Sequence, residues 1–390
     1  MAKESPRVRV AHLTSVHARR DTRIFLKECR SLVAADFEVF LIVADGEGPA
    51  VVDGVQIVDV GLRAPRRAAR ALVTAAHVFA AAQRVRADIY HFHDPELLPW
   101  GLLLRLSGKR VVYDAHEHLP HDVLSKRYLP AGLLKPISLI AGSCELLAAR
   151  GLSAVVAATP DILQRFQGSP LASIGVYNFP LTEELLSGGD WNDRQVQACY
   201  VGGISLNRGV REVAAAAGLC RARIVLAGPL WDGLTQEQLA AMPGWSRINY
   251  RGVLSRTGVA DVMASSRVGI VTLLPTTSHL NSLPTKLFEY MSAGMAVVAS
   301  DFPLWRKIVS ETGSGLCIDP TDPAAIATAV DRLVSDTEFG AACGRNGARA
   351  VTTEFNWSAQ ASKLLQLYRQ LQPQRGSSQS SGSQRADSRD

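Results

Sequence analysis

Two segments in the second half of the chain carry residues that could bind a nucleoside diphosphate. In the first, YVGGISLNRGV, Gly202 and Gly203 follow an apolar run, and Arg208 stands just before a helical segment. A helix N-terminus presents unpaired N–H groups, and a guanidinium beside it neutralises phosphate. The alternative interpretation is a glycine turn with a solvated arginine. Neither G-x-G-x-x-G nor the P-loop pattern occurs, which disfavours NAD(P) and ATP chemistry.

The second segment, residues 279–300, is the most informative in the chain. Its sequence HLNSLPTKLFEYMSAGMAVVAS predicts a helix that ends at Gly294. Glu289 lies one turn in from Thr285 and Lys286, where a carboxylate can accept two hydrogen bonds from a ribose diol. The N–H groups at the start of this helix would then face a diphosphate.

These residues must be positioned by the elements around them, which alternate between short apolar strands and helices. Near-continuous apolar runs are typical of parallel strands buried on both faces. Strands are predicted at 7–13, 38–44, 55–60, 89–94, 110–117, 153–159, 174–179, 197–204, 222–229, 248–254, 268–275, 296–303 and 315–320. Helices are predicted at 21–35, 68–86, 95–106, 131–150 and 357–371. This alternation predicts an α/β protein with two Rossmann-like, doubly wound domains facing a central cleft.

The composition along the chain predicts where the domains begin and end. We expect an N-terminal domain over 1–180, a linker over 181–197 and a C-terminal domain over 198–352. A C-terminal helix over 353–371 is expected to pack back on the N-terminal domain. The Ser/Gln/Gly-rich tail 372–390 is expected to be disordered.

The overall composition excludes several classes of protein. The chain has 390 residues, of which 47% are hydrophobic and 20% charged, as in ordinary globular domains. Six dispersed cysteines form no C-x-x-C pair, so we expect thiols of a reducing cytoplasm and no metal site. The charged N-terminus does not resemble a signal peptide, and no uncharged apolar stretch reaches the ~18–20 residues of a membrane span. The net charge of +6 has no basic–aromatic stripe behind it, so we expect no nucleic-acid partner.

Several motifs, taken in their order along the chain, resemble those of one enzyme family. DTRIFLKECRSL, HFHDPELLP and VVYDAHEHLP occur in the first half, and YVGGI…NRG, LAGP and YRGVLS in the second. Over about residues 7–371 the chain resembles the retaining GT-B glycosyltransferases of family 4, of the type that builds bacterial cell-surface polysaccharides. The resemblance implies a nucleotide-sugar donor held by the C-terminal domain and a glycan or polyprenyl-linked acceptor held by the N-terminal domain. It also implies same-face retention and no metal or other cofactor.

On the donor side, the resemblance implies roles residue by residue. Glu289 matches the second glutamate of the family's Glu-x7-Glu motif, whereas Asn281 stands where the first is common. Arg208 replaces the family's usual lysine, and the family's second phosphate-binding arginine falls near Gly203. Leu287 would contribute its backbone N–H. The implied donor-binding positions are Gly202, Gly203, Gly228, Gly252, Val253, Asn281, Thr285, Leu287 and Glu289. The implied catalytic positions are His116, Arg208, Lys286 and Glu289.

On the acceptor side, the resemblance places His116 opposite the donor sugar, after a predicted strand. The implied acceptor-side residues are Asp21, Arg23, His93, Asp94 and Glu117. A structural role for His116 is the alternative, and Asp94 could instead cap the helix that begins at Pro95. The loop before Asp21 reads SVHARRDTR, without the glycines usual in the family.

Further hypotheses concern partners and rival functions. The basic residues Arg63, Arg66, Arg67, Arg70 and Lys135 flank apolar runs and could contact anionic lipid, which would place the protein in the cytoplasm at the membrane surface. A solvated arginine face over core helices is the alternative. The amide at the usual glutamate position and the missing arginine leave open a non-catalytic nucleotide-sugar-binding subunit. A GT-B sugar-nucleotide epimerase is a further alternative.

Overall fold

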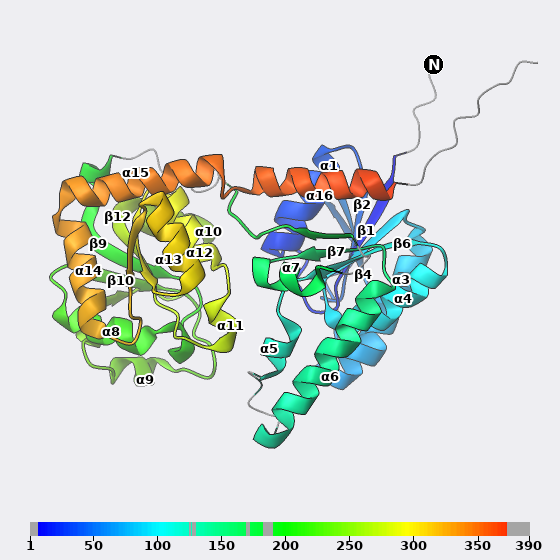
Figure 1. Ribbon diagram of the computed structural model, residues 1–390, viewed down its shortest axis with the longest axis horizontal. Coiled ribbons are helices and arrows are strands. Elements are labelled where there is room, and N and C mark those ends of the chain that lie inside the picture. The colour runs from blue at the N-terminus through cyan, green and yellow to red at the C-terminus, as the bar shows by residue number, and fades with distance from the viewer. Residues whose placement is uncertain (1–6, 125, 127–129, 169–171, 182–189, 373–390) are drawn as a thin grey trace, which may run out of the picture.

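The computed structural model describes residues 7–124, 126, 130–168, 172–181 and 190–372. These form two α/β domains that lie side by side, joined at one edge by the helices α15 and α16 (Figure 1). The predicted α/β class and the two doubly wound domains are confirmed.

The N-terminal domain contains an eight-stranded sheet with helices on both faces. Its strands are β1 (Arg9–Leu13), β2 (Glu38–Val43), β3 (Ala50–Val52), β4 (Val55–Asp59), β5 (Ile89–Phe92), β6 (Arg110–Ala115), β7 (Ala154–Ala157) and β8 (Ala172–Gly175). Its helical segments are η1 (Thr22–Cys29), α1 (Arg30–Ala34), α2 (Arg67–Ala69), η2 (Arg70–Thr74), α3 (Ala75–Val85), η3 (Pro95–Leu97), α4 (Leu98–Leu106), α5 (Leu119–Leu124), α6 (Ala131–Arg150) and α7 (Pro160–Phe166).

The C-terminal domain contains a six-stranded sheet, and the chain then returns to the first domain through α16. Its strands are β9 (Gln195–Val201), β10 (Arg223–Ala227), β11 (Ile248–Tyr250), β12 (Ser266–Val271), β13 (Ala296–Ser300) and β14 (Gly315–Ile318). The helical segments are η5 (Trp191–Asp193), η6 (Leu206–Arg208), α8 (Val210–Leu219), α9 (Gln236–Ala240), η7 (Trp245–Arg247), α10 (Arg256–Ser265), α11 (Thr277–Leu280), α12 (Thr285–Ser292), α13 (Pro303–Thr312), α14 (Pro323–Ser335), α15 (Thr337–Thr353) and α16 (Trp357–Leu371).

The order of strands places a ligand-binding crevice in each domain. The first sheet runs β3-β4-β2-β1-β5-β6-β7-β8, and the second runs β11-β10-β9-β12-β13-β14. The strand order therefore reverses beside β1 in the first sheet and beside β9 in the second. Because open α/β sheets bind ligands at the carboxyl ends of strands at such switch points, the loops after β1, β5, β9 and β12 are the places for chemistry.

Several elements differ from the sequence-based expectation, among them the helices α5 and α7, which were not predicted. The short strand β3, which was not predicted, pairs antiparallel with β4 across a turn at Asp53 and Gly54, both with positive φ. An Asp-Gly pair between apolar runs is a hairpin signal that identifies it. Strand β8 begins at 172 rather than 174, and β9 begins at Gln195, inside the predicted linker. Most of that linker, and the tail from 373, lie outside the described residues.

Helix α16 packs on the N-terminal domain rather than on the domain that precedes it in sequence (Figure 1). Trp357, Leu364 and Tyr368 are buried in the same apolar cluster as strands β1 and β2. The indole N–H of Trp357 donates to Ser31 Oγ at 2.8 Å. Burying a large apolar side chain contributes about 1.5–3 kcal/mol, so this helix ties the C-terminus of the chain to the first sheet.

Candidate functional site

A cavity of about 850 Å³ lies between the two domains. Its lining on the C-terminal side comes from the loops after β9 and β12 and from the start of α12, and on the N-terminal side from the loop after β6, α5 and α7. Six predicted site residues line it: His116, Glu117, Arg208, Asn281, Thr285 and Lys286. The other predicted positions do not line it: Asp21, Arg23, His93, Asp94, Gly202, Gly203, Gly228, Gly252, Val253, Leu287 and Glu289.

Two cations face the cavity from the C-terminal domain. The ammonium of Lys286 lies 3.9 Å from the centre of the Tyr200 ring, and the guanidinium of Arg208 lies 4.6 Å from the Trp231 ring. In the described part of the chain, no carboxylate lies within ion-pairing distance of either, and the Lys286 ammonium makes no hydrogen bond. Burial, reinforced by repulsion from Arg208 and opposed by Glu289, lowers the pKa of Lys286 to about 7. Two aromatic-backed cations without a carboxylate partner suit a diphosphate.

Glycines allow the loops around these cations to approach closely. Gly209 precedes α8 in the left-handed region, and a Cβ there would lie 2.1 Å from the carbonyl oxygen of Thr272. A Cβ on Gly228 would lie 2.0 Å from the carbonyl oxygen of Gly202. A Cβ on Gly202 would in turn touch the Lys286 side chain at 2.4 Å. The predicted positions Gly202 and Gly228 therefore shape the loops that hold Lys286, although they do not line the cavity.

Trp231 explains why the chain has no arginine near Gly203. A Cβ at Gly203 would lie 2.7 Å from the Trp231 ring, so no longer side chain fits there. Trp231 stacks on Arg208 instead and holds the remaining guanidinium at the cavity. Sequence reasoning missed this residue, because a tryptophan in a loop has no motif of its own.

Asn281 makes a contact across the cleft between the domains. Its side-chain amide donates to the Asp161 carboxylate at 3.3 Å. A glutamate in its place would bring a second carboxylate beside Asp161, which would disfavour the contact between the domains. The contact with Asp161 therefore explains why an amide, and not a carboxylate, suits this position.

The remaining donor-side positions lie away from the cavity lining. Glu289 is half-buried on α12, and burial raises the pKa of its carboxyl, an effect that Lys27 and Lys286 oppose. Val253 is exposed after β11, and Gly252 adopts a positive φ in open space. Leu287 corrects the prediction made for it: its side chain is fully buried, and its N–H already donates to the carbonyl of Pro284 at 3.1 Å.

His116 is held at the cavity by a buried carboxylate on the N-terminal side. Its Nε2 lies 2.8 Å from Asp114 Oδ2, and Asp114 is in turn bound by the guanidinium of Arg23 at 2.8 and 2.9 Å. Burial opposes ionisation of Asp114, but Arg23 and His116 outweigh it and hold the pKa of this carboxyl well below its usual range. Asp114 therefore stays ionised and orients His116.

The contacts of the other acceptor-side residues correct part of the prediction. Arg23 is buried and fully engaged with Asp114 and the carbonyl of Val176. Asp21 accepts from the N–H groups of Arg23 and Ile24 and so caps η1, but its carboxylate is partly exposed, and its acceptor-side role stays a prediction.

His93 and Asp94 are also buried and not available to an acceptor. Asp94 does not cap the helix after it, but accepts from Thr14 Oγ1 and from the N–H and Oγ of Ser15, at 2.6–3.1 Å. It therefore shapes the loop after β1.

Comparisons with known proteins match both halves of the chain. The family model described as "Glycosyltransferase Family 4" matches residues 22–173, and that described as "Glycosyl transferases group 1" matches residues 195–336. The alpha-D-kanosaminyltransferase of Streptomyces kanamyceticus is 26% identical over 46% of this chain and 47% of its own length. A phosphatidyl-myo-inositol mannosyltransferase of Mycobacterium leprae is 30% identical over 34% and 35%. The chain thus spans about half or less of the length of these relatives.

Solved structures resemble the chain over nearly its whole length. A sucrose-phosphate synthase from Thermosynechococcus elongatus has a TM-score of 0.75 at 16% identity, covering 94% of this chain and 99% of that one. Anabaena HepE in complex with UDP-glucose has a TM-score of 0.69 at 13% identity, covering 93% and 99%. At these identities the likeness is one of fold.

Proposed function

Because the chain belongs to the family-4 glycosyltransferases and has their GT-B fold, we propose that it transfers a sugar from a nucleotide-diphosphate sugar to a hydroxyl group with retention. The acceptor is a glycan or a lipid-linked glycan of cell-surface polysaccharide synthesis. The observation that carries the proposal is the pair of cations without carboxylate partners, Lys286 and Arg208, at the cavity between the domains.

These two cations stabilise the charge that develops on the departing diphosphate. As the bond from the anomeric carbon to the phosphate oxygen breaks, negative charge grows on the phosphate, and fixed positive groups in a partly dry site lower the barrier. The acceptor oxygen forms its new bond on the same face. The acceptor proton passes to the leaving phosphate oxygen. The transfer step uses no metal or other cofactor, because Lys286 and Arg208 supply the charge.

His116 faces the same cavity from the N-terminal domain and contacts the sugar that is transferred. Asp114 holds its Nε2, and Arg23 holds Asp114, so the ring orientation is set before substrate binds. Glu117, which also lines the cavity, lies on the acceptor side.

A screen of donors tests the proposal directly. UDP-, GDP- and dTDP-sugars are compared by the rise in thermal midpoint of the purified chain, and the stabilising donor is then assayed for hydrolysis and transfer. We expect one nucleotide class to stabilise the parent and Arg208→Ala to lose most of that shift. Binding without turnover under any acceptor condition would favour the accessory subunit suggested by Asn281. Conversion of the donor without an acceptor would favour an epimerase.

Nucleotide binding should take up a proton at mildly alkaline pH. With a pKa of about 7, Lys286 is mostly neutral in the free protein at about pH 8, and a bound diphosphate favours its charged form. Affinity for UDP or GDP should therefore fall as pH rises above about 7, by at most about tenfold per pH unit. Calorimetry in buffers of different ionisation enthalpy measures the uptake. Lys286→Arg, which stays charged, should bind without it, and equal heats for the parent in all buffers would contradict the assignment.

Helix α6 supports membrane contact on the acceptor side. It carries apolar side chains outward and polar groups inward: Leu139 and Ile140 are 71% and 64% exposed, whereas Ser138 and Glu145 are buried. Among the described residues this is one helix, over Gly132–Arg150, that is long and apolar enough to cross a membrane. Figure 1 shows it at the outer edge of the N-terminal domain. We propose that this face meets an anionic membrane surface from the cytoplasm, where a polyprenyl-linked acceptor resides.

The basic residues contribute less to this surface than the sequence suggests. Arg70 is paired with Glu96 at 2.8 and 2.9 Å, and Arg63 donates to the carbonyl of Val16. The exposed leucines of α6 are therefore the stronger argument for contact with lipid.

Flotation with liposomes tests the membrane contact. The parent should float with phosphatidylglycerol-containing vesicles, and a Leu139→Ser, Ile140→Ser double variant should float several-fold less, because it loses apolar area at the interface. Leu219→Ser, which changes an exposed leucine of the C-terminal domain, is the matched control. No flotation of the parent at moderate salt would remove the proposal.

A further inference from the structure

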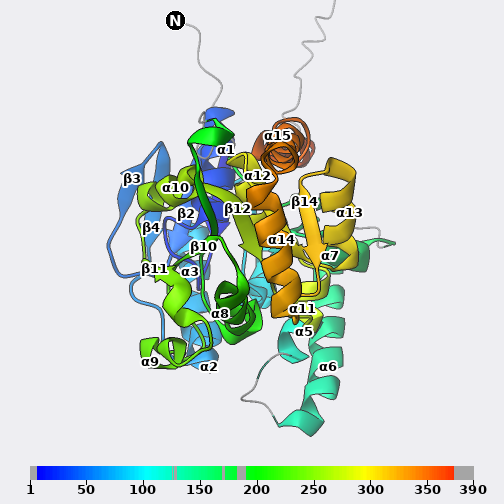
Figure 2. The ribbon, with the colours of Figure 1, turned by 90° about the vertical axis from the view of Figure 1, so that its left-hand side faces the viewer.

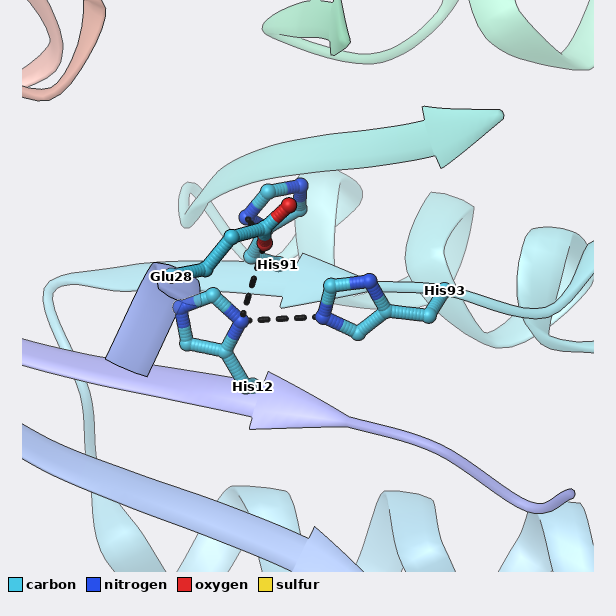
Figure 3. Close-up of side chains that lie close together, drawn as sticks. All are labelled: His12, Glu28, His91 and His93. Atoms are coloured by element: carbon cyan, nitrogen blue, oxygen red, sulfur yellow. Dashed lines mark hydrogen bonds and ion pairs between the residues drawn. The ribbon is translucent and has the colours of Figure 1, made fainter. Parts of the chain in front are cut away.

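A second polar cluster lies inside the N-terminal domain, behind the cavity. His12 lies near the end of β1, His91 lies near the end of β5 and His93 just after it, and Glu28 lies on η1 (Figure 3). In the parallel register of these strands His12 stands opposite His91, and His93 follows two residues later on the same face of the sheet. The cluster is formed by residues from three separate segments, all of them at most 2% exposed.

The four side chains converge on one point. His12 Nδ1 lies 2.9 Å from His93 Nε2 and 3.7 Å from Glu28 Oε2, and His91 Nδ1 lies 3.8 Å from the same oxygen. One ligand atom from each residue lies within 4.8 Å of all the others. Ligands at about 2.0–2.2 Å from a tetrahedral metal ion are about 3.3–3.6 Å apart, so shifts of a few tenths of an ångström bring these atoms to tetrahedral spacing.

The Glu28 carboxylate has no hydrogen-bond partner in this position. It is completely buried, and neither of its oxygens accepts a hydrogen bond from any described residue. Two charged groups act on it closely: the guanidinium of Arg23, which lies 3.2 Å from Oε1 and also binds Asp114, and the Asp114 carboxylate itself. The other oxygen, Oε2, is the one that points to the histidines. A buried carboxylate is costly unless it is paired or coordinates a metal.

Groups around the cluster orient two of the three histidine rings. His93 Nδ1 lies 3.1 Å from Asp114 Oδ2, and His12 Nε2 lies 3.3 Å from the Tyr368 hydroxyl. The same hydroxyl lies 2.6 Å from His91 Nδ1, a hydrogen bond that an ion bound at that nitrogen would replace. The His12 and His93 rings thus each have a partner on the nitrogen that faces away from the cluster, as is typical of metal-bound histidines.

We propose that this chain binds one divalent transition-metal ion of the zinc type through His12, His91, His93 and Glu28. Three imidazoles and one carboxylate are ligands that zinc and its neighbours in the first transition row prefer, and that magnesium and calcium do not. The site is structural, because none of its four ligands lines the cavity. The ion joins β1, β5 and η1, and through His93 it supports Asp114, which orients His116.

Metal analysis of the intact chain, purified without a histidine tag, tests the proposal. Expression in medium containing zinc, manganese, iron and cobalt should yield about one ion per chain by mass spectrometry. A strong chelator should lower the thermal midpoint of unfolding, and added zinc should restore it. Reconstitution of the stripped parent with cobalt should give the intense visible absorption of a tetrahedral Co²⁺ site, a result that requires no variant.

Two variants locate the ion. Glu28→Gln keeps the size of the side chain and removes its charge, and it should reduce the bound metal to less than about a fifth of the parent's. His118→Ala is the control, since His118, His121 and Asp161 form a separate, partly exposed group in the cavity. This variant should keep its metal.

Two results would overturn the proposal. One is a folded parent that holds less than about a tenth of an ion per chain and shows no shift with chelator or zinc. The other is metal that is lost in His118→Ala and kept in Glu28→Gln. Metal content is measured without donor or acceptor, so a failure here leaves the proposed sugar transfer standing.

Discussion

Replacing Glu289 by alanine is expected to lower kcat/KM for sugar transfer by about 30- to 900-fold. This corresponds to about 2–4 kcal/mol of transition-state stabilisation, which is the expected loss if Glu289 makes the charge-assisted contact to the donor ribose that the sequence predicts. Glu289 is half-buried on α12, one turn beyond Lys286, and two cations, Lys27 and Lys286, favour its ionised form. The measurement is steady-state transfer with the donor that the screen identifies.

A contact between Glu289 and the ribose predicts a second effect of the same variant, on binding. Affinity for the nucleoside diphosphate should fall, whereas affinity for inorganic pyrophosphate, which has no ribose, should change little. Glu354→Ala, which removes an exposed glutamate at the end of α15, should leave both unchanged. Parent-like turnover in Glu289→Ala would refute the assignment, and equal losses for pyrophosphate and nucleotide would place Glu289 at the phosphates instead.

Replacing Arg23 by alanine is expected to lower the free energy of unfolding by about 3–5 kcal/mol. Arg23 is buried and forms two hydrogen bonds to Asp114 at 2.8 and 2.9 Å, with Glu28 3.2 Å away. Its removal leaves buried carboxylates without a compensating charge, which is one of the costliest changes in a protein interior. Urea denaturation at neutral pH measures the loss. Arg9→Ala, which breaks the exposed ion pair with Glu38, should cost less than about 1 kcal/mol.

The cost of Arg23→Ala should depend on pH in a defined direction. The pKa of Asp114 is depressed in the folded parent, so its contribution to stability is fully present above the unfolded value of about 4 and is lost as pH falls below it. The difference between parent and variant should therefore shrink below about pH 4. A difference that stays constant into acid would show that Arg23 acts through packing and not through the Asp114 carboxylate.

The cavity was predictable from the sequence as far as its loops are concerned. Parallel strands bring their carboxyl ends to one edge of a sheet, so residues that follow different strands meet there. His116 follows β6, Arg208 follows β9, and Lys286 lies in the first turn of α12, and all three line one cavity. Their residue types and the order of the motifs were sufficient to select them.

The site predictions failed where a contact with another part of the chain determines what a group can bind. The sequence predicts an acceptor contact for Arg23, but its guanidinium is already bound to Asp114, which lies 91 residues away in the sequence. The N–H of Leu287 was assigned to the diphosphate, but the carbonyl of Pro284 already accepts it. Trp231 was not predicted at all, although it fills the space where an arginine was missing. Sequence position specifies none of these pairings.

The sequence by itself determined the α/β class, the two domains and the edge of each sheet at which chemistry occurs, because periodicity and turn residues act locally. The tertiary structure decided which charged groups face the cavity and which are already paired inside the protein. His12 and His93 are 81 residues apart and touch only because β1 and β5 are neighbours in the sheet. Residues far apart in the sequence can form a metal site, so the lack of a metal-ligand spacing pattern in the sequence does not argue against an ion at the cluster around Glu28. Its ligands become neighbours through strand order, which local sequence does not encode.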